Sequence, residues 1–338
     1  MVSTMMTARV HLSSTVPHAC RFAGLRLAVA AALLLACDSG SGGPVGPIPD
    51  PVPGPGDFTR TILSSGLERS YGLHVPPGWS ADADMPLVLA FHGALSSPAH
   101  LRAVSRLDDV ADQSGVVVAY PAAALGDWNT ECLQCGSDAV VEEIDDLGFV
   151  SDLVDQLVAD AGIDRRRVYV IGISNGALFV HYLACAAQDV VAAAASVAAT
   201  LIAPEYVPAC DGGAIPMAFF HGSDDTFFPP EGGFAGNNVV NVRLLSIEQS
   251  VESWADRDGC DGGPEITALP DAEDDGTTVT RELHADCHGD AAVVYYAIEG
   301  GGHTWPGSPV PSGGAVGRTS RDVSASALAV DFFLDHAR

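Results

Sequence analysis

Short, uninterrupted apolar segments recur along the chain and limit its fold more than any other feature. Because polar residues do not alternate within them, each predicts a strand covered on both faces, as in a parallel sheet flanked by helices. Six segments of this kind lie at 85–91, 116–120, 168–171, 191–197, 215–220 and 293–298. Two loosely alternating segments, 59–64 and 69–75, precede them and predict an opening antiparallel pair.

Helical periodicity fills the intervals between the predicted strands. Apolar residues recur there every three or four positions, which predicts helices at 98–113, 146–161, 175–187, 244–257 and 324–336. This alternation predicts a mostly parallel, doubly wound α/β sheet flanked by helices, in a single domain over residues 58–338. Two long segments, 122–143 and 261–278, fit neither pattern and are expected to be loops.

The first 57 residues differ in composition from the rest. Residues 1–36 carry three arginines, no acidic residue and an apolar run at 27–36, which favours an export signal over a buried core helix. The run ends in Leu-Leu-Ala-Cys, which is similar to a bacterial lipobox with Cys37 as the lipidated residue. Simple secretion, with Cys37 free or removed, is the alternative. Residues 37–57 are rich in Gly and Pro and are interpreted as a tether.

The charge of the chain restricts its partners. The sequence holds 43 acidic residues against 16 basic ones, all of them arginine. Such a surface repels phosphate backbones, so nucleic acid is not expected to bind. We expect an exported monomer, extracellular or held in the cell envelope, that touches a membrane only through an N-terminal lipid.

Six cysteines lie in the predicted domain, and an oxidising compartment favours disulfides between them. Six cysteines allow about 15 pairings, of which proximity in sequence favours Cys132–Cys135, Cys185–Cys210 and Cys260–Cys287. The first pair could instead be half of a zinc site. The sequence has no second CxxC motif to complete such a site, so no metal is expected.

Gly-Ile-Ser-Asn-Gly at 172–176 is the central chemical motif. It follows a predicted strand and opens a predicted helix, which is the setting of a nucleophile elbow with Ser174 exposed at a sharp turn. The small flanking residues permit the close backbone approach that such a turn requires. We therefore expect an α/β-hydrolase fold with Ser174 as the nucleophile.

A serine nucleophile needs a base and an orienting acid, which follow it along the chain in this fold. His303 lies in a Gly-rich loop just beyond the segment 293–298 and is the expected base; an incidental His in a tight turn is the alternative. Asp224 and Asp225 follow the segment 215–220, and either could hold the imidazole in its working tautomer. Two solvated loop carboxylates are the alternative.

The oxyanion hole of this fold uses two backbone amides. One comes from the loop after an early strand and the other from the residue after the nucleophile, which assigns Ala94 and Asn175. Five side chains are candidates for the substrate pocket: His92, Trp128, Phe227, Phe228 and Trp305. The two phenylalanines could equally serve in packing.

Several motifs together resemble the polyhydroxybutyrate depolymerase and feruloyl esterase group of α/β hydrolases. In chain order they are His-Gly at 92–93, Trp-Asn at 128–129, Asp-Asp-Leu-Gly-Phe at 145–149, the elbow at 172–176, His-Gly-Ser-Asp-Asp at 221–225 and Gly-Gly-His-Thr-Trp-Pro-Gly at 301–307. The resemblance extends from about residue 59 to 336. It implies hydrolysis of carboxylic esters without a cofactor, Asp225 as the triad acid, and the disulfides Cys185–Cys210 and Cys260–Cys287.

The substrate stays open at this point. Polyhydroxyalkanoate oligomers compete with feruloyl or acetyl esters of plant polysaccharide, and no appended polymer-binding module is apparent. A non-catalytic surface binding protein on the same scaffold is an alternative of another class, since fold does not fix function, and a peptidase is a further one.

Overall fold

A computed structural model describes residues 51–132, 134–234 and 242–338. The predicted signal at 1–36, Cys37 and most of the tether at 37–57 lie outside these described residues. No helix in the described part is both long and apolar enough to span a membrane.

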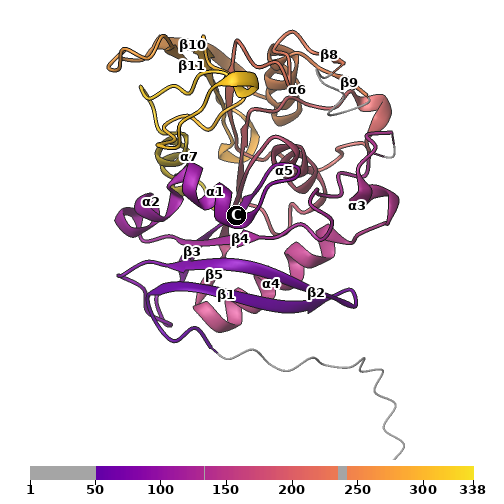
Figure 1. Ribbon diagram of the computed structural model, residues 1–338, viewed down its shortest axis with the longest axis vertical. Helices are drawn as coiled ribbons and strands as arrows, with labels where there is room; N and C mark the ends of the chain where they lie inside the picture. The colour runs from indigo at the N-terminus through magenta and orange to yellow at the C-terminus, as the bar shows by residue number, and fades with distance from the viewer. Residues whose placement is uncertain (1–50, 133, 235–241) are drawn as a thin grey trace, which may run out of the picture. The chain divides into compact units, whose positions relative to one another are not determined.

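A mixed sheet of ten strands runs through the domain (Figure 1). Its spatial order is β1-β2-β4-β3-β5-β6-β7-β12-β11-β10. The pairs from β4 to β12 are parallel, and those at both edges are antiparallel. The strands are β1 (Gly56–Ser64), β2 (Leu67–Val75), β3 (Met85–Phe91), β4 (Val117–Pro121), β5 (Ile163–Ile173), β6 (Ala193–Val197), β7 (Met217–Gly222), β10 (Gly262–Ala268), β11 (Thr278–Ala285) and β12 (Val293–Glu299). A separate small pair consists of β8 (Gly233–Phe234) and β9 (Arg243–Leu244).

Helices cover both faces of the sheet, as the alternation of segments predicts. One buried cluster joins the sheet to α4 (Asp146–Ala161), α5 (Asn175–Ala186) and α6 (Ile247–Asp258). The other joins it to α1 (Pro98–Ser105), α2 (Leu107–Ser114) and α7 (Ala325–Leu334). The central strands β3, β4, β6 and β7 are buried along their whole length, because each lies between these two layers. The expected α/β-hydrolase architecture is confirmed.

Three expectations from the sequence are wrong in detail. The segment 98–113 forms two helices, because Arg106 takes a left-handed conformation (φ 52°) that ends α1 and begins α2. The segment 261–278 is not all loop, since β10 occupies its first half and pairs with β11. Both strands carry polar residues and β10 is largely exposed, so neither shows the apolar run that marks a central strand. A one-turn helix, α3 (Asp138–Val141), interrupts the predicted loop 122–143.

β10 closes one edge of the sheet. Its register shifts between Gly262 and Glu265, around Pro264, and Ile266 is exposed.

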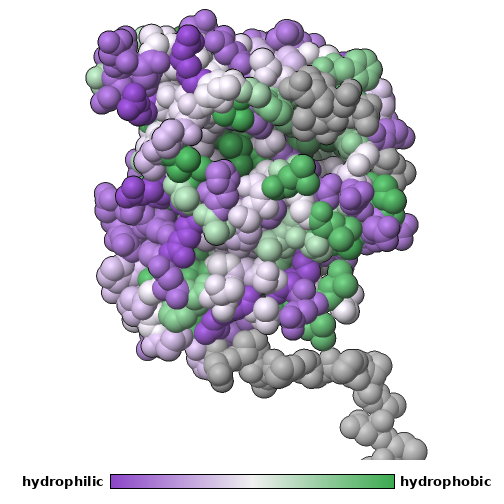
Figure 2. Space-filling view, in the orientation of Figure 1, coloured by the Kyte–Doolittle hydropathy of each residue, from purple (hydrophilic) through white to green (hydrophobic). Residues whose placement is uncertain are grey.

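The three disulfides favoured by sequence proximity are all present: Cys132–Cys135, Cys185–Cys210 and Cys260–Cys287. On the face drawn in Figure 2, hydrophilic residues line the left and upper rim, and several small apolar groups lie near the middle.

Candidate active site

Ser174 lies on the sharp turn between β5 and α5. Its backbone has φ 58° and ψ −125°, a conformation that a residue with a side chain rarely adopts and that marks strain at functional turns. The flanking glycines allow the turn to close: a Cβ on Gly172 would lie 2.4 Å from the carbonyl oxygen of Gly176. A Cβ on Gly176 would lie 2.3 Å from the carbonyl oxygen of Phe91, so the elbow and β3 could not approach as they do.

Asp225 and His303 meet across the carboxyl ends of β7 and β12. Asp225 is buried, and its Oδ2 lies 2.9 Å from Nδ1 of His303. Its Oδ1 accepts from the amides of Phe227 at 2.8 Å and Phe228 at 2.9 Å, which fixes the carboxylate. Because a carboxylate accepts hydrogen bonds, Nδ1 of His303 carries the proton and Nε2 keeps a free lone pair.

Asp224, the neighbouring carboxylate, has a different environment. Its side chain is 58% exposed and lies 3.6 Å from Arg318 in a surface ion pair. It makes no contact with His303 among the interactions of the described residues. Only Asp225 therefore has the geometry of an orienting acid.

Two aromatic rings pack against His303. The ring of Phe228 is stacked on the imidazole at 5.7 Å between centroids, and that of Phe227 is tilted against it at 4.9 Å. Phe228 is fully buried, which supports the packing alternative for this residue, whereas Phe227 remains partly accessible. The two rings limit the rotation of the imidazole.

His221 is a supporting residue that the sequence analysis did not single out. Its Nε2 donates to the carbonyl oxygen of Phe228 at 2.9 Å and lies 4.0 Å from Oδ2 of Asp225. Burial lowers the pKa of His221, although the charge of Asp225 opposes this shift. A neutral His221 thus holds the loop that carries Asp225. The only signal was its place at the start of the 221–225 motif.

The loop after β3 lies against the elbow. A Cβ on Gly93 would be 3.2 Å from Cβ of Ser174, so Gly93 lies against the serine. The amide of Ala94 belongs to the next residue along the chain. Within the described ranges, the amides of Ala94 and Asn175 have no acceptor, and the hydroxyl of Ser174 has no hydrogen bond to His303. Two unpaired amides and a free hydroxyl suit a site that receives a carbonyl group.

His92 and Trp128 support this loop. Nδ1 of His92 donates to the carbonyl oxygen of Gly93 at 2.8 Å, and its Nε2 accepts from the amide of Ala123 at 3.2 Å. The indole of Trp128 donates to the carbonyl oxygen of His92 at 2.9 Å, and its amide donates to Oδ1 of Asn175 at 2.8 Å. This arrangement ties both candidate oxyanion amides to one scaffold, and burial lowers the pKa of His92.

The structure places three of the pocket candidates inside the protein. His92 and Trp128 are buried and act as supports, and Trp305 is buried with its indole donating to Ser326 at 3.0 Å. Their polar atoms are already bonded inside the protein, so they do not present a wall to a substrate.

A separate cavity of about 320 Å³ lies between α5, α6 and the segment 201–210. None of the candidate catalytic residues lines it. Its wall includes His181, whose pKa burial lowers to about 3.

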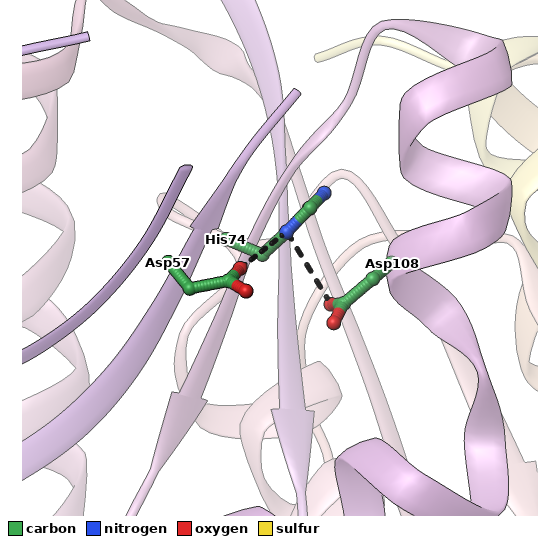
Figure 3. Close-up of side chains that lie close together, drawn as sticks. All are labelled: Asp57, His74 and Asp108. Carbon is green, nitrogen blue, oxygen red and sulfur yellow. Dashed lines mark hydrogen bonds and ion pairs between the residues drawn. The ribbon is translucent and has the colours of Figure 1, made fainter. Parts of the chain in front are cut away.

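Asp57, His74 and Asp108 form the one group of potential metal ligands found in the described ranges (Figure 3). Nδ1 of His74 lies 2.8 Å from Asp57 and Nε2 lies 3.0 Å from Asp112. Two carboxylate partners require both nitrogens to be protonated. Burial lowers the pKa of His74, but the hydrogen bonds to the carboxylates and the charge of Asp108 outweigh it, so the pKa is raised. Arg102 also pairs with Asp57 and Asp108, so both carboxylates of this group already face two protein cations.

Comparison with known proteins identifies relatives of the chain. Residues 69–209 match the family model described as esterase PHB depolymerase. The esterase NocK of Nocardia uniformis subsp. tsuyamanensis, which is described as putative, is 32% identical over 81% of this chain and 82% of its own length. Feruloyl esterase B of Piromyces equi is 29% identical over 68% of this chain, and poly(3-hydroxyalkanoate) depolymerase C of Paucimonas lemoignei is 27% identical over 70%. The chain spans 41% and 58% of the lengths of these two relatives, less than two thirds of each.

Solved structures show the same fold. Acetyl xylan esterase from Aspergillus awamori superposes with a TM-score of 0.51 over 73% of this chain and 94% of its own, at 16% identity. Thermogutta terrifontis esterase 2 superposes with a TM-score of 0.53 over 83% of this chain and 95% of its own, at 15% identity. The match to NocK over most of both chains, together with the family model and this fold, shows that the chain belongs to the esterase PHB depolymerase family and has the α/β-hydrolase fold.

Proposed function

We propose that the chain is a serine carboxylic ester hydrolase that acts through an acyl-enzyme, with Ser174 as nucleophile, His303 as base and Asp225 as orienting acid. The observation that carries the proposal is the 2.9 Å hydrogen bond between Asp225 and Nδ1 of His303, which leaves Nε2 free to accept a proton. The strained turn at Ser174 and the unpaired amides beside it support the same assignment.

The proposed reaction uses these groups in order. Nε2 of His303 takes the proton of Ser174 as its oxygen attacks the ester carbonyl carbon. The negative oxygen of the tetrahedral intermediate accepts hydrogen bonds from the amides of Ala94 and Asn175. The alcohol leaves with the proton from His303, and water then cleaves the acyl-enzyme by the reverse sequence.

A polyhydroxybutyrate-type oligoester is the leading substrate class, because the matching family model is described as esterase PHB depolymerase and depolymerase C is named for poly(3-hydroxyalkanoate). Feruloyl or acetyl esters of polysaccharide are the second candidate, which is favoured by the similarity to feruloyl esterase B and to a bifunctional acetylxylan esterase/xylanase of Neocallimastix patriciarum. Relative kcat/KM on hydroxybutyrate oligomers, methyl ferulate and acetylated xylan decides between them.

The N-terminal organisation belongs to the same proposal. Residues 1–36 direct export, Cys37 carries the lipid that holds the enzyme at the cell envelope, and residues 37–57 tether the catalytic domain that begins at 58. The acidic composition opposes attachment to anionic headgroups by charge, so the lipid alone would hold the monomer there.

The experiment that tests the catalytic assignment replaces Ser174 by Ala and measures release of nitrophenol from 4-nitrophenyl butyrate. The variant should fold normally and lose at least about 10⁴-fold in kcat, because no other group forms the covalent bond. Ser253→Ala, at an exposed position on α6, is the matched control and should keep wild-type activity. Comparable activity in Ser174→Ala and the wild type would refute the catalytic assignment. A wild type that releases no nitrophenol would favour the non-catalytic binding protein.

A further inference from the structure

Leu95 is the most exposed large apolar side chain in the described part of the protein. Its exposed fraction is 95%, in the loop that leaves β3. A fully solvated leucine gains nothing from burial, so packing of the folded chain does not explain why this position is apolar.

The backbone at Leu95 does not favour leucine either. Leu95 has φ 55°, in the left-handed region, and lies in a turn closed by the bond from the amide of Ser96 to the carbonyl oxygen of Gly93 at 3.2 Å. Gly or Asn is the usual residue at a turn position with positive φ, because a bulky side chain is strained there. Neither local conformation nor burial therefore accounts for Leu95.

A second exposed leucine lies in the loop that is hydrogen-bonded to the loop of Leu95. The amide of Leu95 donates to the carbonyl oxygen of Gly126 at 2.8 Å, which fixes the two loops together. Leu125, the residue before Gly126, is 45% exposed. Two solvated leucines thus project from loops that are hydrogen-bonded to each other.

The position of this pair relates it to the candidate active site. Leu95 directly follows Ala94, and Gly93 on the other side of Ala94 touches Ser174. A carbonyl group held by the amide of Ala94 would lie one residue along the chain from Leu95.

We propose that Leu95 and Leu125 form an apolar lip that binds the apolar part of the ester substrate next to the bond that is cleaved. This inference rests on the proposed esterase function and extends it to specificity: the enzyme should favour esters with longer alkyl or aryl groups over acetyl esters of small alcohols. Either the acyl or the alcohol group of a single ester molecule can supply this apolar surface.

The test compares Leu95→Asn with Leu63→Asn, a leucine that is also exposed but lies at the far edge strand β1. Asn tolerates positive φ, so the turn that carries Ala94 should be kept. For each protein, kcat/KM is measured on 4-nitrophenyl acetate, butyrate and octanoate, and on ethyl, butyl and octyl acetate. The first series lengthens the acyl group and the second lengthens the alcohol.

On the longest ester of at least one series, Leu95→Asn should lower kcat/KM about tenfold. The loss should appear as a higher KM, because each methylene group returned to water weakens binding about fourfold. It should change less than twofold on ethyl acetate, which is short on both sides of the ester, and Leu63→Asn should match the wild type throughout. An equal loss on short and long esters would overturn the inference, because it would make Leu95 a structural part of the oxyanion loop. Unchanged ester kinetics with lost adsorption to polyhydroxybutyrate particles would also overturn it, in favour of a polymer-surface contact. A wild type without any ester hydrolysis would overturn the proposed function and this inference together.

Discussion

Replacing Asp225 by Asn should reduce kcat by about 10⁴-fold, the magnitude known for this exchange in serine protease triads. The structure gives the reason. Oδ1 of Asp225 accepts from two backbone amides, so the carbonyl oxygen of an Asn at this position keeps that place and its NH₂ group faces Nδ1 of His303. Nδ1 must then accept, the proton moves to Nε2, and the imidazole can no longer take a proton from Ser174.

The opposite orientation of the Asn amide is disfavoured. It would place the NH₂ group against the amides of Phe227 and Phe228, and each buried amide left without an acceptor costs about 1–3 kcal/mol. A loss of 10⁴-fold corresponds to about 5.4 kcal/mol of transition-state stabilisation.

Asp224→Asn is the matched control, because it makes the same chemical change one residue away. Among the interactions of the described residues, its carboxylate takes part only in an exposed ion pair with Arg318, and such pairs contribute about 0–1 kcal/mol, so kcat should stay within about twofold of the wild type. The assay is kcat on 4-nitrophenyl butyrate, with thermal unfolding of both variants to verify folding. A larger loss for Asp224→Asn, or equal losses, would refute the assignment of the acid.

Three further predictions concern other parts of the chain. Gly176→Ala should destabilise the fold by about 3 kcal/mol in urea unfolding, because the new Cβ meets the backbone of Phe91, whereas Gly78→Ala meets no atom within 4 Å and should be neutral. Protonated His74 is stabilised by its carboxylate partners in the folded protein. Its contribution to the free energy of unfolding is therefore complete below the ordinary imidazole pKa and is lost as pH rises through the raised pKa of His74. Urea unfolding of the wild type should therefore lose more stability from slightly acidic to alkaline pH than that of His74→Gln, and parallel profiles would contradict this. Cys37→Ser should abolish N-terminal acylation without changing activity, and a native N-terminus without an acyl mass in mass spectrometry would exclude the anchor.

The fold was predictable from the sequence where burial imposes a pattern. The strands covered on both faces had to be apolar throughout, and α4 matches its predicted range residue for residue. β10 and β11 were not predicted because an edge hairpin needs no apolar run. The break at Arg106 was not predicted because a single backbone angle divides a continuous helical pattern.

The candidate site was predictable as a set of motifs in order, but not as a set of contacts. Chain order and loop position pointed to the residues that the structure brings together at the ends of β7 and β12. Sequence could not show that Trp128 and Trp305 face inward, since an indole suits a pocket wall and a protein core equally well. It also could not separate Asp224 from Asp225, because adjacent carboxylates differ only in which backbone amides reach them.

The edge strand β10 has a consequence for how the folded chain behaves at high concentration. A free strand edge can recruit the edge of another molecule and start a fibril-like stack. Here Pro264 offers no N–H to such a partner, and the register shift interrupts the regular spacing of donors and acceptors. Glu265 adds a negative charge, which would repel the Glu265 of a second copy. Concentrated solutions should therefore resist stacking through this edge, even though Ile266 exposes an apolar side chain on it.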